Sequence, residues 1–408
     1  MKTTILTFFF LLSGLFLSAQ TANYWVKKAD FIGSKRERAV SFSIGNYGYL
    51  ATGVDTAEVV LKDLWQYDPL LDTWSQKADL PGSARRDAVG FSLGDKGYIS
   101  AGIDNNEALV GTKLKDLWQY DPSLNTWTQK SDFPGAGGLG IYFATAFAID
   151  AKGYICCGKK GPSVYSNELW EYKPSIDQWT QRASFPGGVR YQLSSFTIGN
   201  EAFVGLGTTQ DIFKRDFWKF NPGSNTWTQI ADLPGNERGS ASSFVTGGRG
   251  FVCLGTDGGL LNDLWEYKPE ADAWFSRAPF GGSERKNAIS FTVNDRVFVG
   301  TGKGVTGKKA SIYEYIPHDF LGMTDAETNV NFYPNPSSDE VNFFSSSSSV
   351  SHIELLSSDG KIIAQGKVSE QGELTLQVRD FPNGIYYINV FTEERGMLSS
   401  HRILIQHL

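Results

Sequence analysis

Short alternations of apolar and polar residues recur along most of this chain, and turn-forming residues interrupt them at regular places. The stretch 87–130 shows the pattern. Residues 87–93 alternate, 94–97 form a Gly-Asp-Lys-Gly turn, and 98–101, 117–120 and 125–130 alternate again. Alternation with a period of two, bounded by turn residues, is typical of half-buried β-strands. This stretch therefore predicts four short antiparallel strands.

The four-strand pattern occurs six times, and aromatic residues mark each copy. The third strand of each copy carries a central aromatic residue: Trp65, Trp118, Trp170, Trp218, Trp265 and Tyr313, spaced 53, 52, 48, 47 and 48 residues apart. A second tryptophan follows nine positions after each of the first five, at Trp74, Trp127, Trp179, Trp227 and Trp274. Such a period predicts an all-β fold, a six-bladed β-propeller with one four-stranded blade per repeat.

The sixth repeat lacks its last strand, and the N-terminal end of the chain supplies a matching one. Residues 24–31 read like 73–80, and Trp25 takes the place of the missing second tryptophan. We expect this segment to pair with 312–316 as the outer strand of the last blade, because a ring has no open strand edges. All 11 tryptophans then fall at two repeat positions, so packing explains them.

The repeat resembles the kelch repeat over residues 24–317, with a glycine at the end of strand two, a tyrosine in strand three and a tryptophan in strand four. Kelch repeats usually carry paired glycines at the end of strand two. Here a single glycine is present in each copy, at Gly53, Gly102, Gly158, Gly207, Gly255 and Gly302. This departure places the chain among the divergent kelch-like or galactose-oxidase-type propellers.

The N-terminal end has the layout of a secretory signal peptide. Lys2 precedes the apolar run 5–17, and Ser18-Ala19-Gln20 offers a cleavage site after Ala19. The run is too short to span a bilayer, and no other segment is long and apolar enough to do so. We therefore expect a signal peptide over 1–19, a propeller over 20–320 and export from the cell.

The composition changes near Thr324, where the aromatic repeats stop. Short alternating segments predict strands at 341–344, 353–356, 361–364, 374–378, 385–391 and 402–405. The motif Tyr333-Pro334-Asn335-Pro336, the turn at 358–361 and the segment 381–387 resemble the type A sorting domain of the type IX secretion system. That resemblance implies a linker and a small Ig-like β-sandwich over 321–408. It also implies that the type IX machinery of a Bacteroidetes-type Gram-negative bacterium is a partner. The mature protein would then be secreted or lie on the outer cell surface.

Charge and cysteine content narrow the classes of partner and cofactor. The net charge is −6 and no basic stripe is present, so we expect no nucleic-acid partner. Cys156 and Cys253 share a repeat position that Ala51, Ser100, Gly205 and Gly300 fill elsewhere, which indicates buried thiols acting as small side chains. Adjacent strand residues point to opposite faces, so Cys157 is not expected to bond to Cys156.

Five arginines share one repeat position, six residues before a phenylalanine: Arg36, Arg85, Arg190, Arg238 and Arg285. They predict a partial ring near the channel mouth, suited to an anion or carboxylate. The alternative is a structural role, since a residue that every blade repeats usually satisfies a neighbouring carbonyl or carboxylate. The repeat is least regular in blades one to three, which adds Arg38 and Tyr142 as candidate ligand-binding residues.

Three classes of function remain open: a binding module, a carbohydrate-active enzyme, and a structural or adhesion component with no small ligand. The first would recognise an unknown glycan or protein through the arginine-lined mouth. Within the second, copper oxidation of galactose is disfavoured because the first histidine is His318, and no sialidase box is present. A sialic-acid mutarotase-like epimerase needs arginine and an acid or base, but no metal. We favour the binding module, with no cofactor and no catalytic metal.

Overall fold

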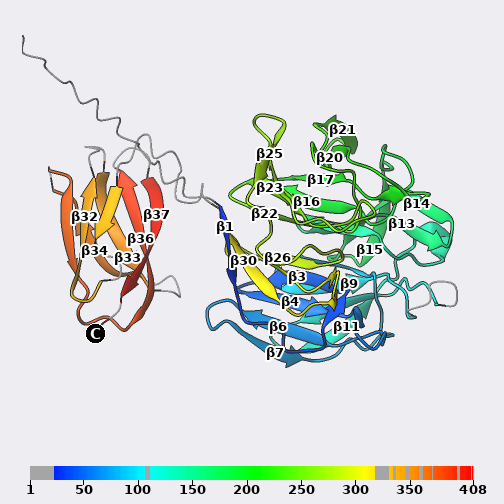
Figure 1. Cartoon of the computed structure of the whole chain (residues 1–408), viewed down its shortest axis with the longest axis horizontal. Helices are drawn as coiled ribbons and strands as arrows, with labels where there is room; N and C mark the ends of the chain where they lie inside the picture. Colours follow the sequence, from blue (N-terminus) through cyan, green and yellow to red (C-terminus); the bar gives the residue numbers. More distant parts are fainter. Residues whose placement is uncertain are drawn as a thin grey trace, which may run out of the picture. The chain divides into compact units, whose positions relative to one another are not determined.

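The computed structural model describes residues 23–105, 111–317, 330–333, 337–345, 350–357, 362–369, 371–392, 396–405 and 407. The chain forms two compact units, and the boundary between them follows Ile316 (Figure 1). The expected signal peptide lies outside the described residues, as do Pro334, Asn335 and Pro336 of the sorting motif.

The first unit contains six four-stranded antiparallel sheets, as the repeat predicts. The inner strands are β3 (Val40–Ile44), β8 (Val89–Leu93), β12 (Thr145–Ile149), β16 (Ser194–Ile198), β22 (Ser242–Thr246) and β26 (Ile289–Val293). The second strands are β4 (Tyr47–Ala51), β9 (Lys96–Ser100), β13 (Lys152–Gly161), β17 (Glu201–Gly205), β23 (Arg249–Cys253) and β27 (Arg296–Gly300). The third strands are β6 (Leu64–Asp68), β10 (Leu117–Asp121), β14 (Val164–Lys173), β20 (Phe217–Asn221), β24 (Leu264–Lys268) and β30 (Ile312–Ile316). The outer strands are β7 (Thr73–Lys77), β11 (Thr126–Lys130), β15 (Gln178–Arg182), β21 (Thr226–Ile230), β25 (Ala273–Arg277) and β1 (Tyr24–Lys27).

The remaining short elements of this unit lie in its connecting segments. Three two-stranded ribbons pair β2 (Arg36–Glu37) with β5 (Val54–Asp55), β18 (Thr208–Thr209) with β19 (Ile212–Phe213), and β28 (Lys303–Gly304) with β29 (Gly307–Lys308). One 3-10 turn, η1 (Ala136–Gly138), lies in the connection that enters blade three.

Burial falls from the inner strands of each blade to the outer strand. In blade one the inner strand alternates buried and half-buried residues, the second strand has four buried residues in succession, and the outer strand is mostly exposed. The buried side chains pack between neighbouring blades. Phe42 and Leu64 of blade one share a cluster with Ile99 and Tyr120 of blade two. The core of the ring is therefore a set of blade-to-blade interfaces.

The N-terminal strand takes the outer place in blade six. Strand β1 pairs antiparallel with β30, with Tyr24 opposite Ile316 and Lys27 opposite Tyr313. Blade six also packs on blade one: Phe31 and Trp74 share a cluster with Phe291 and Phe298. Blades one and six thus meet through the same kind of apolar interface as the other neighbours.

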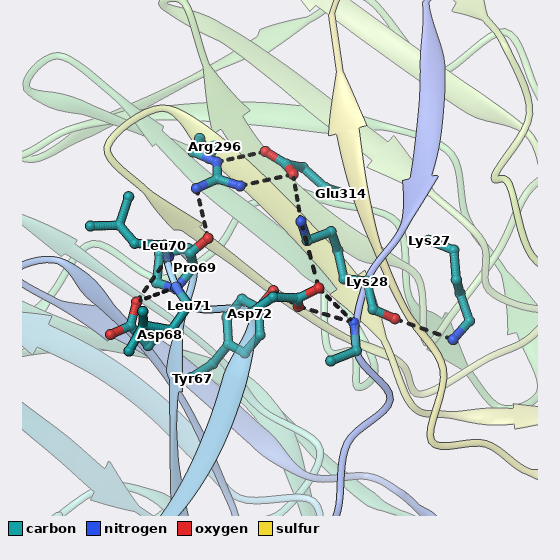
Figure 2. A network of polar contacts seen from close by, with 11 residues as sticks. Lys27, Lys28, Tyr67, Asp68, Pro69, Leu70, Leu71, Asp72, Arg296 and Glu314 are labelled. Atoms are coloured by element: carbon teal, nitrogen blue, oxygen red, sulfur yellow. Dashed lines mark hydrogen bonds and ion pairs between the residues drawn. The ribbon is translucent and has the colours of Figure 1, made fainter. Parts of the chain in front are cut away.

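Polar contacts reinforce this seam (Figure 2). Arg296 donates to both carboxylate oxygens of Glu314, at 2.6 and 3.0 Å, and to the carbonyl of Pro69 at 2.9 Å. Lys28 lies 3.7 Å from the carboxylates of both Glu314 and Asp72. The Ala29 amide donates to Asp72 at 3.0 Å, the bond that Ala78 makes to Asn125 between blades one and two. The seam therefore shares this bond with a regular blade boundary.

The single glycine at the end of strand two is explained by the backbone. Gly53 has φ +97°, and a Cβ there would lie 2.8 Å from the carbonyl oxygen of Glu37. The preceding residue, Thr52, also has a positive φ of 64°. The other five residues that precede this glycine share that conformation: Ala101, Cys157, Leu206, Leu254 and Thr301. The chain keeps the conformation that paired glycines favour, at about 1–2 kcal/mol for each non-glycine residue.

All three cysteines are free and buried, as the repeat position of two of them predicts. Burial raises the pKa of Cys253 and of Cys156. The expectation that Cys156 and Cys157 point apart is wrong, because their sulfurs lie 3.4 Å from each other. Cys157 leaves the extended conformation with φ 64°, which breaks the alternation of faces.

The second unit contains two antiparallel sheets that enclose a core including Ile353, Ile388 and Ile405. One sheet holds β31 (Val330–Tyr333), β32 (Glu340–Ser345) and β35 (Glu373–Gln377). The other holds β34 (Ile362–Lys367), β33 (Val350–Leu356), β36 (Gly384–Thr392) and β37 (Gly396–Ile405). The six predicted strands are present within a few residues, and β31 was not predicted.

Candidate functional site

The repeated arginines are buried in ion pairs within their own blades. Arg36 is fully buried and donates to both oxygens of Asp63, at 2.6 and 2.7 Å. Its remaining donors go to the carbonyls of Ser34 and Thr52. The same bidentate pair joins Arg85 to Asp116, Arg190 to Asp216, and Arg238 to Asp263.

The central tryptophan of each of these blades completes the unit. Trp118 donates its indole N–H to Asp116 at 2.6 Å, and Trp65, Trp218 and Trp265 do the same in their blades. Burial by itself would raise the pKa of Asp116, but the hydrogen bonds and charge of Arg85 outweigh it and the pKa is lowered. Each unit is thus an arginine, a carboxylate and a tryptophan that satisfy one another.

This geometry corrects the ligand-binding role expected for Arg36, Arg85, Arg190, Arg238 and Arg285. The five side chains are at most 3% exposed, and each donates to a carbonyl of its own blade. The structural alternative describes them better: each guanidinium ties a blade entry to the start of strand three. The repeated aspartates are the partners of four of them.

Blade three lacks the arginine of the unit and has glutamate in place of aspartate. Ile141 stands where the other blades have arginine, and its carbonyl accepts from Gly102 as the carbonyl of Arg85 accepts from Gly53. Glu168 holds the carboxylate position and pairs with Lys160 at 2.8 Å. The loss of the arginine is therefore matched by a lysine from a neighbouring strand.

Two residues beyond the arginine position, the backbone forms a circle of hydrogen bonds. The Arg38 amide donates to Asn287, Asn287 to Ser240, Ser240 to Gln192, Gln192 to Phe143, Phe143 to Asp87, and Asp87 back to Arg38. The N···O distances are 2.9–3.2 Å. All six residues have φ between 54° and 60°, so the six blades hold this position in one conformation.

The same six residues line a cavity of about 160 Å³ on the axis of the ring. Behind them lie the small residues Ala39, Ala88, Ala144, Ala241 and Ala288. The six positions carry six different side chains: one cation, one carboxylate, one aromatic ring, two amides and one hydroxyl. The backbone conformation is the same in all six blades, but the side chains differ in charge and polarity. This arrangement is expected of a ligand site on a rigid scaffold.

Charged groups gather on one side of this axial cavity. Arg38 lies 3.5 Å from the carboxylate of Asp87 and 3.7 Å from that of Glu37. Asp87 also accepts a hydrogen bond from the buried Arg86, and the Asn287 amide donates to Glu37 at 2.8 Å. Burial raises the pKa of Asp87, against the effect of the two arginines. Arg38 keeps 26% of its side chain exposed, so it can reach a bound molecule.

Two polar atoms at the axial cavity have no hydrogen-bond partner among the described residues. They are Nε of Arg38 and Oγ of Ser240, and both are buried. Buried polar atoms are normally hydrogen-bonded to protein or to ordered water. Their position at the cavity makes them natural contacts for a ligand or for solvent.

A tyrosine cluster adjoins the axial cavity in blades three and four. The Lys159 ammonium lies 4.4 Å from the ring centre of Tyr191, 5.4 Å from Tyr165 and 6.0 Å from Tyr142. Burial lowers the pKa of Lys159. The Phe143 ring lies 6.0 Å from that of Tyr191, so aromatic contact runs from the cavity to this cluster.

The structure therefore brings together only part of the predicted site. Arg38 lines the axial cavity, and Tyr142 lies beside it with a buried hydroxyl that has no partner among the described residues. The sequence analysis missed Asp87, Phe143, Gln192, Ser240 and Asn287. A signal was present: each lies two residues after the repeated arginine, or after Ile141 in blade three, and the residue type there differs in every blade.

Comparison with known proteins agrees with both units. Residues 331–406 match the family of secretion system C-terminal sorting domains. The chain joins a β-propeller to a type IX sorting tail. The structure is similar to the solved structure of YjhT, with a TM-score of 0.61, 14% sequence identity, and coverage of 71% of this chain and 96% of that one. This likeness shows the fold alone.

The remaining findings do not indicate an activity for this chain. No curated protein matches the chain. Within the described part of the chain, no helix has the length and apolar character needed to cross a membrane. The sorting tail implies export to the cell surface or secretion.

Proposed function

We propose that the exported propeller is a binding module that takes the end of a glycan, or a protein side chain of similar chemistry, into the axial cavity. The observation that carries this proposal is the contrast between the circle of identical backbone positions and the six unlike side chains that it presents. Packing requirements repeat from blade to blade, so they give no reason for six different residues at one position.

The composition of the cavity favours a small polyhydroxylated group with an anionic substituent. Amide, hydroxyl and carboxylate groups hydrogen-bond hydroxyls, and Arg38 offers a charged donor for a carboxylate or sulfate. The guanidinium nitrogens of Arg38 lie 3.5 Å from the carboxylate of Asp87 and 3.7 Å from that of Glu37, without a short hydrogen bond to either. A ligand anion would therefore compete for Arg38 with two acceptors that hold it loosely.

A second candidate is anomer exchange on an acidic sugar, as in a sialic-acid mutarotase-like epimerase. The observation that favours it is the buried carboxyl of Asp87 beside Arg38, with a pKa raised by burial. A raised pKa suits a carboxyl to donating and accepting a proton better than the ordinary value does, and Arg38 would hold the sugar carboxylate.

The test is a thermal-shift screen of the full chain against neutral, carboxylated and sulfated sugars, followed by calorimetry with the compounds that raise the melting temperature. We expect Arg38→Ala to weaken binding by about 10- to 100-fold, the loss of a charge-assisted hydrogen bond of about 1.5–3 kcal/mol. Arg215→Ala is the matched control, because Arg215 is half exposed and makes only a 3.9 Å ion pair. Equal affinity for the two variants would move the site away from the axial cavity.

Anomer exchange separates the two candidate functions. Two-dimensional exchange NMR on a bound acidic sugar would show faster interconversion of the anomers with the wild type than with Asp87→Asn. If a sugar binds and the rate of its anomer exchange does not change, the propeller acts as a binding module and not as an epimerase.

A further inference from the structure

We propose that blade six contains a site for a small monovalent anion, a halide or a carboxylate as small as formate, held by Arg285 and Ser311. The site is separate from the axial cavity and does not depend on the proposed function. Its place is defined by the corresponding atoms of the other blades.

Four blades balance the charge of the buried arginine with an aspartate. Arg85 and Asp116 are typical, with two N···O distances of 2.7 Å. Blade three has no arginine, and its Glu168 pairs with Lys160. Five blades therefore hold one positive and one negative group at this position.

Blade six keeps the arginine but lacks the carboxylate. Ser311 stands in the place of aspartate, and Tyr313 in the place of tryptophan. Arg285 is 1% exposed and donates to the carbonyls of Ser283 and Thr301 and to Oγ of Ser311, each at 3.0 Å. Among the described residues, no carboxylate forms an ion pair with Arg285. The nitrogen Nη2, which binds the carboxylate in the four sister blades, has no acceptor there either.

A buried guanidinium without a counter-charge is costly. An isolated charge in a protein interior requires a partner of opposite sign or a shift in its protonation. Burial lowers the pKa of Arg285, but a guanidinium stays protonated in proteins because its ordinary pKa is above about 12. The centre of the Phe280 ring lies 4.9 Å from the guanidinium carbon, and the charge of Glu284 acts on Arg285 without forming an ion pair. An external anion would supply the missing hydrogen-bonded partner of opposite charge.

Gly282 lets the backbone approach Arg285 closely, as the equivalent glycine does in a sister blade. A Cβ on Gly282 would lie 2.8 Å from Nη2 of Arg285, and 2.8 Å from ring carbons of Phe280 and Tyr313. In blade two, a Cβ on the equivalent Gly82 would lie 2.6 Å from Nη2 of Arg85 and 2.8 Å from the carboxylate of Asp116. No carboxylate is among these neighbours in blade six.

Solvent can supply the anion through the side on which the carboxylates lie. The aspartates of the four sister pairs are 19–35% exposed, although their arginines are at most 4% exposed. An anion at the equivalent point in blade six would accept from Nη2 of Arg285. It could also accept from the hydroxyl of Ser311, whose oxygen already accepts from Nη1. A halide or formate matches the charge and the size of the missing carboxylate.

The experiment compares the full-length wild type with Ser311→Asp, which restores the aspartate of the sister blades. Melting temperatures are measured with increasing sodium chloride, bromide or formate, and with sodium methanesulfonate as a bulkier anion at matched ionic strength. We expect chloride, bromide and formate to raise the melting temperature of the wild type beyond the effect of methanesulfonate, by the mass-action term for a ligand of the folded state. Ser311→Asp should melt higher at low salt and lose this difference. Equal anion responses of the two proteins would overturn the proposal.

A second measurement does not depend on the variant. Anomalous scattering from wild-type crystals soaked in bromide should show a peak within hydrogen-bond distance of Nη2 of Arg285. Water alone at that point, with bromide bound only on the surface, would also overturn the proposal.

Discussion

The arginine–aspartate–tryptophan units make a sharp prediction for Asp116→Ala. The substitution leaves the fully buried Arg85 without two of its acceptors and the indole of Trp118 without its only one. Removing one partner of a buried ion pair costs about 3–5 kcal/mol. Asp116 is 20% exposed, so water can reach part of the uncovered charge. We therefore expect a loss of about 3 kcal/mol in the free energy of unfolding, at the lower end of that range.

The matched control is Asp132→Ala, the same substitution in the same repeat. Asp132 lies 3.7 Å from Lys115, and both side chains are more than 40% exposed. An exposed pair of this kind contributes about 0–1 kcal/mol. The two variants thus differ in burial and in hydrogen bonding, with the residue type held constant.

The assay is urea unfolding followed by tryptophan fluorescence. All 11 tryptophans lie in the propeller repeats, so the signal reports the propeller and not the sorting tail. A loss of about 3 kcal/mol should lower the urea midpoint by roughly 1–3 M, given slopes of about 1–3 kcal/mol per M. If Asp116→Ala unfolds no earlier than Asp132→Ala, these units do not stabilise the blades and the structural role assigned to the arginines is wrong.

Two further predictions concern the stability of the propeller at acidic pH and the contacts between blades six and one. The pKa values of Asp116, Asp216 and Asp263 are lowered in the fold, because the arginine and tryptophan contacts outweigh burial. Their contribution is complete above the unfolded pKa of about 4 and is lost as the pH falls from there through the lowered folded pKa values. Urea midpoints should therefore drop as the pH falls below about 4. A flat profile there would contradict the pairing. At the seam, Arg296→Ala removes a bidentate contact to the buried Glu314 and a bond to the Pro69 carbonyl. It should lower the urea midpoint more than Arg215→Ala does, and an equal effect would show that the seam does not limit stability.

The fold could be predicted because the same four-strand pattern occurs six times along the chain. Trp25 identified the closing strand by its resemblance to Trp74, and β1 pairs with β30 as expected. Alternation gave the strands of the second unit in the same way. Strand β31 was missed because its four residues carry too little periodicity to stand out beside the linker.

The site could be predicted only in part because pairing across a blade is not visible along the chain. Arg36 and Asp63 are 27 residues apart, while Arg85 and Asp116 are 31 apart, so their partnership has no fixed spacing. The sequence therefore left a ligand-binding and a structural role open for the arginines, and it did not identify the aspartates as their partners. Blade three gave a hint, since it loses the arginine and has a lysine that reaches Glu168.

The axial cavity was missed for the opposite reason. The six residues of the hydrogen-bonded circle share a position in the repeat and a backbone conformation, but no two of them are of the same residue type. Asp87 and Asn287 look like ordinary turn residues until the circle of hydrogen bonds places them on either side of Arg38 around one axis. A search for positions of constant spacing and changing chemistry would have found them.

The most direct test of the axial site is a crystal structure of the full chain with the sugar that gives the largest thermal shift. Electron density for the sugar should fill the axial cavity, with an acceptor group within hydrogen-bond distance of Arg38. Density for the same sugar on the outer strands, with the cavity holding only water, would contradict the account.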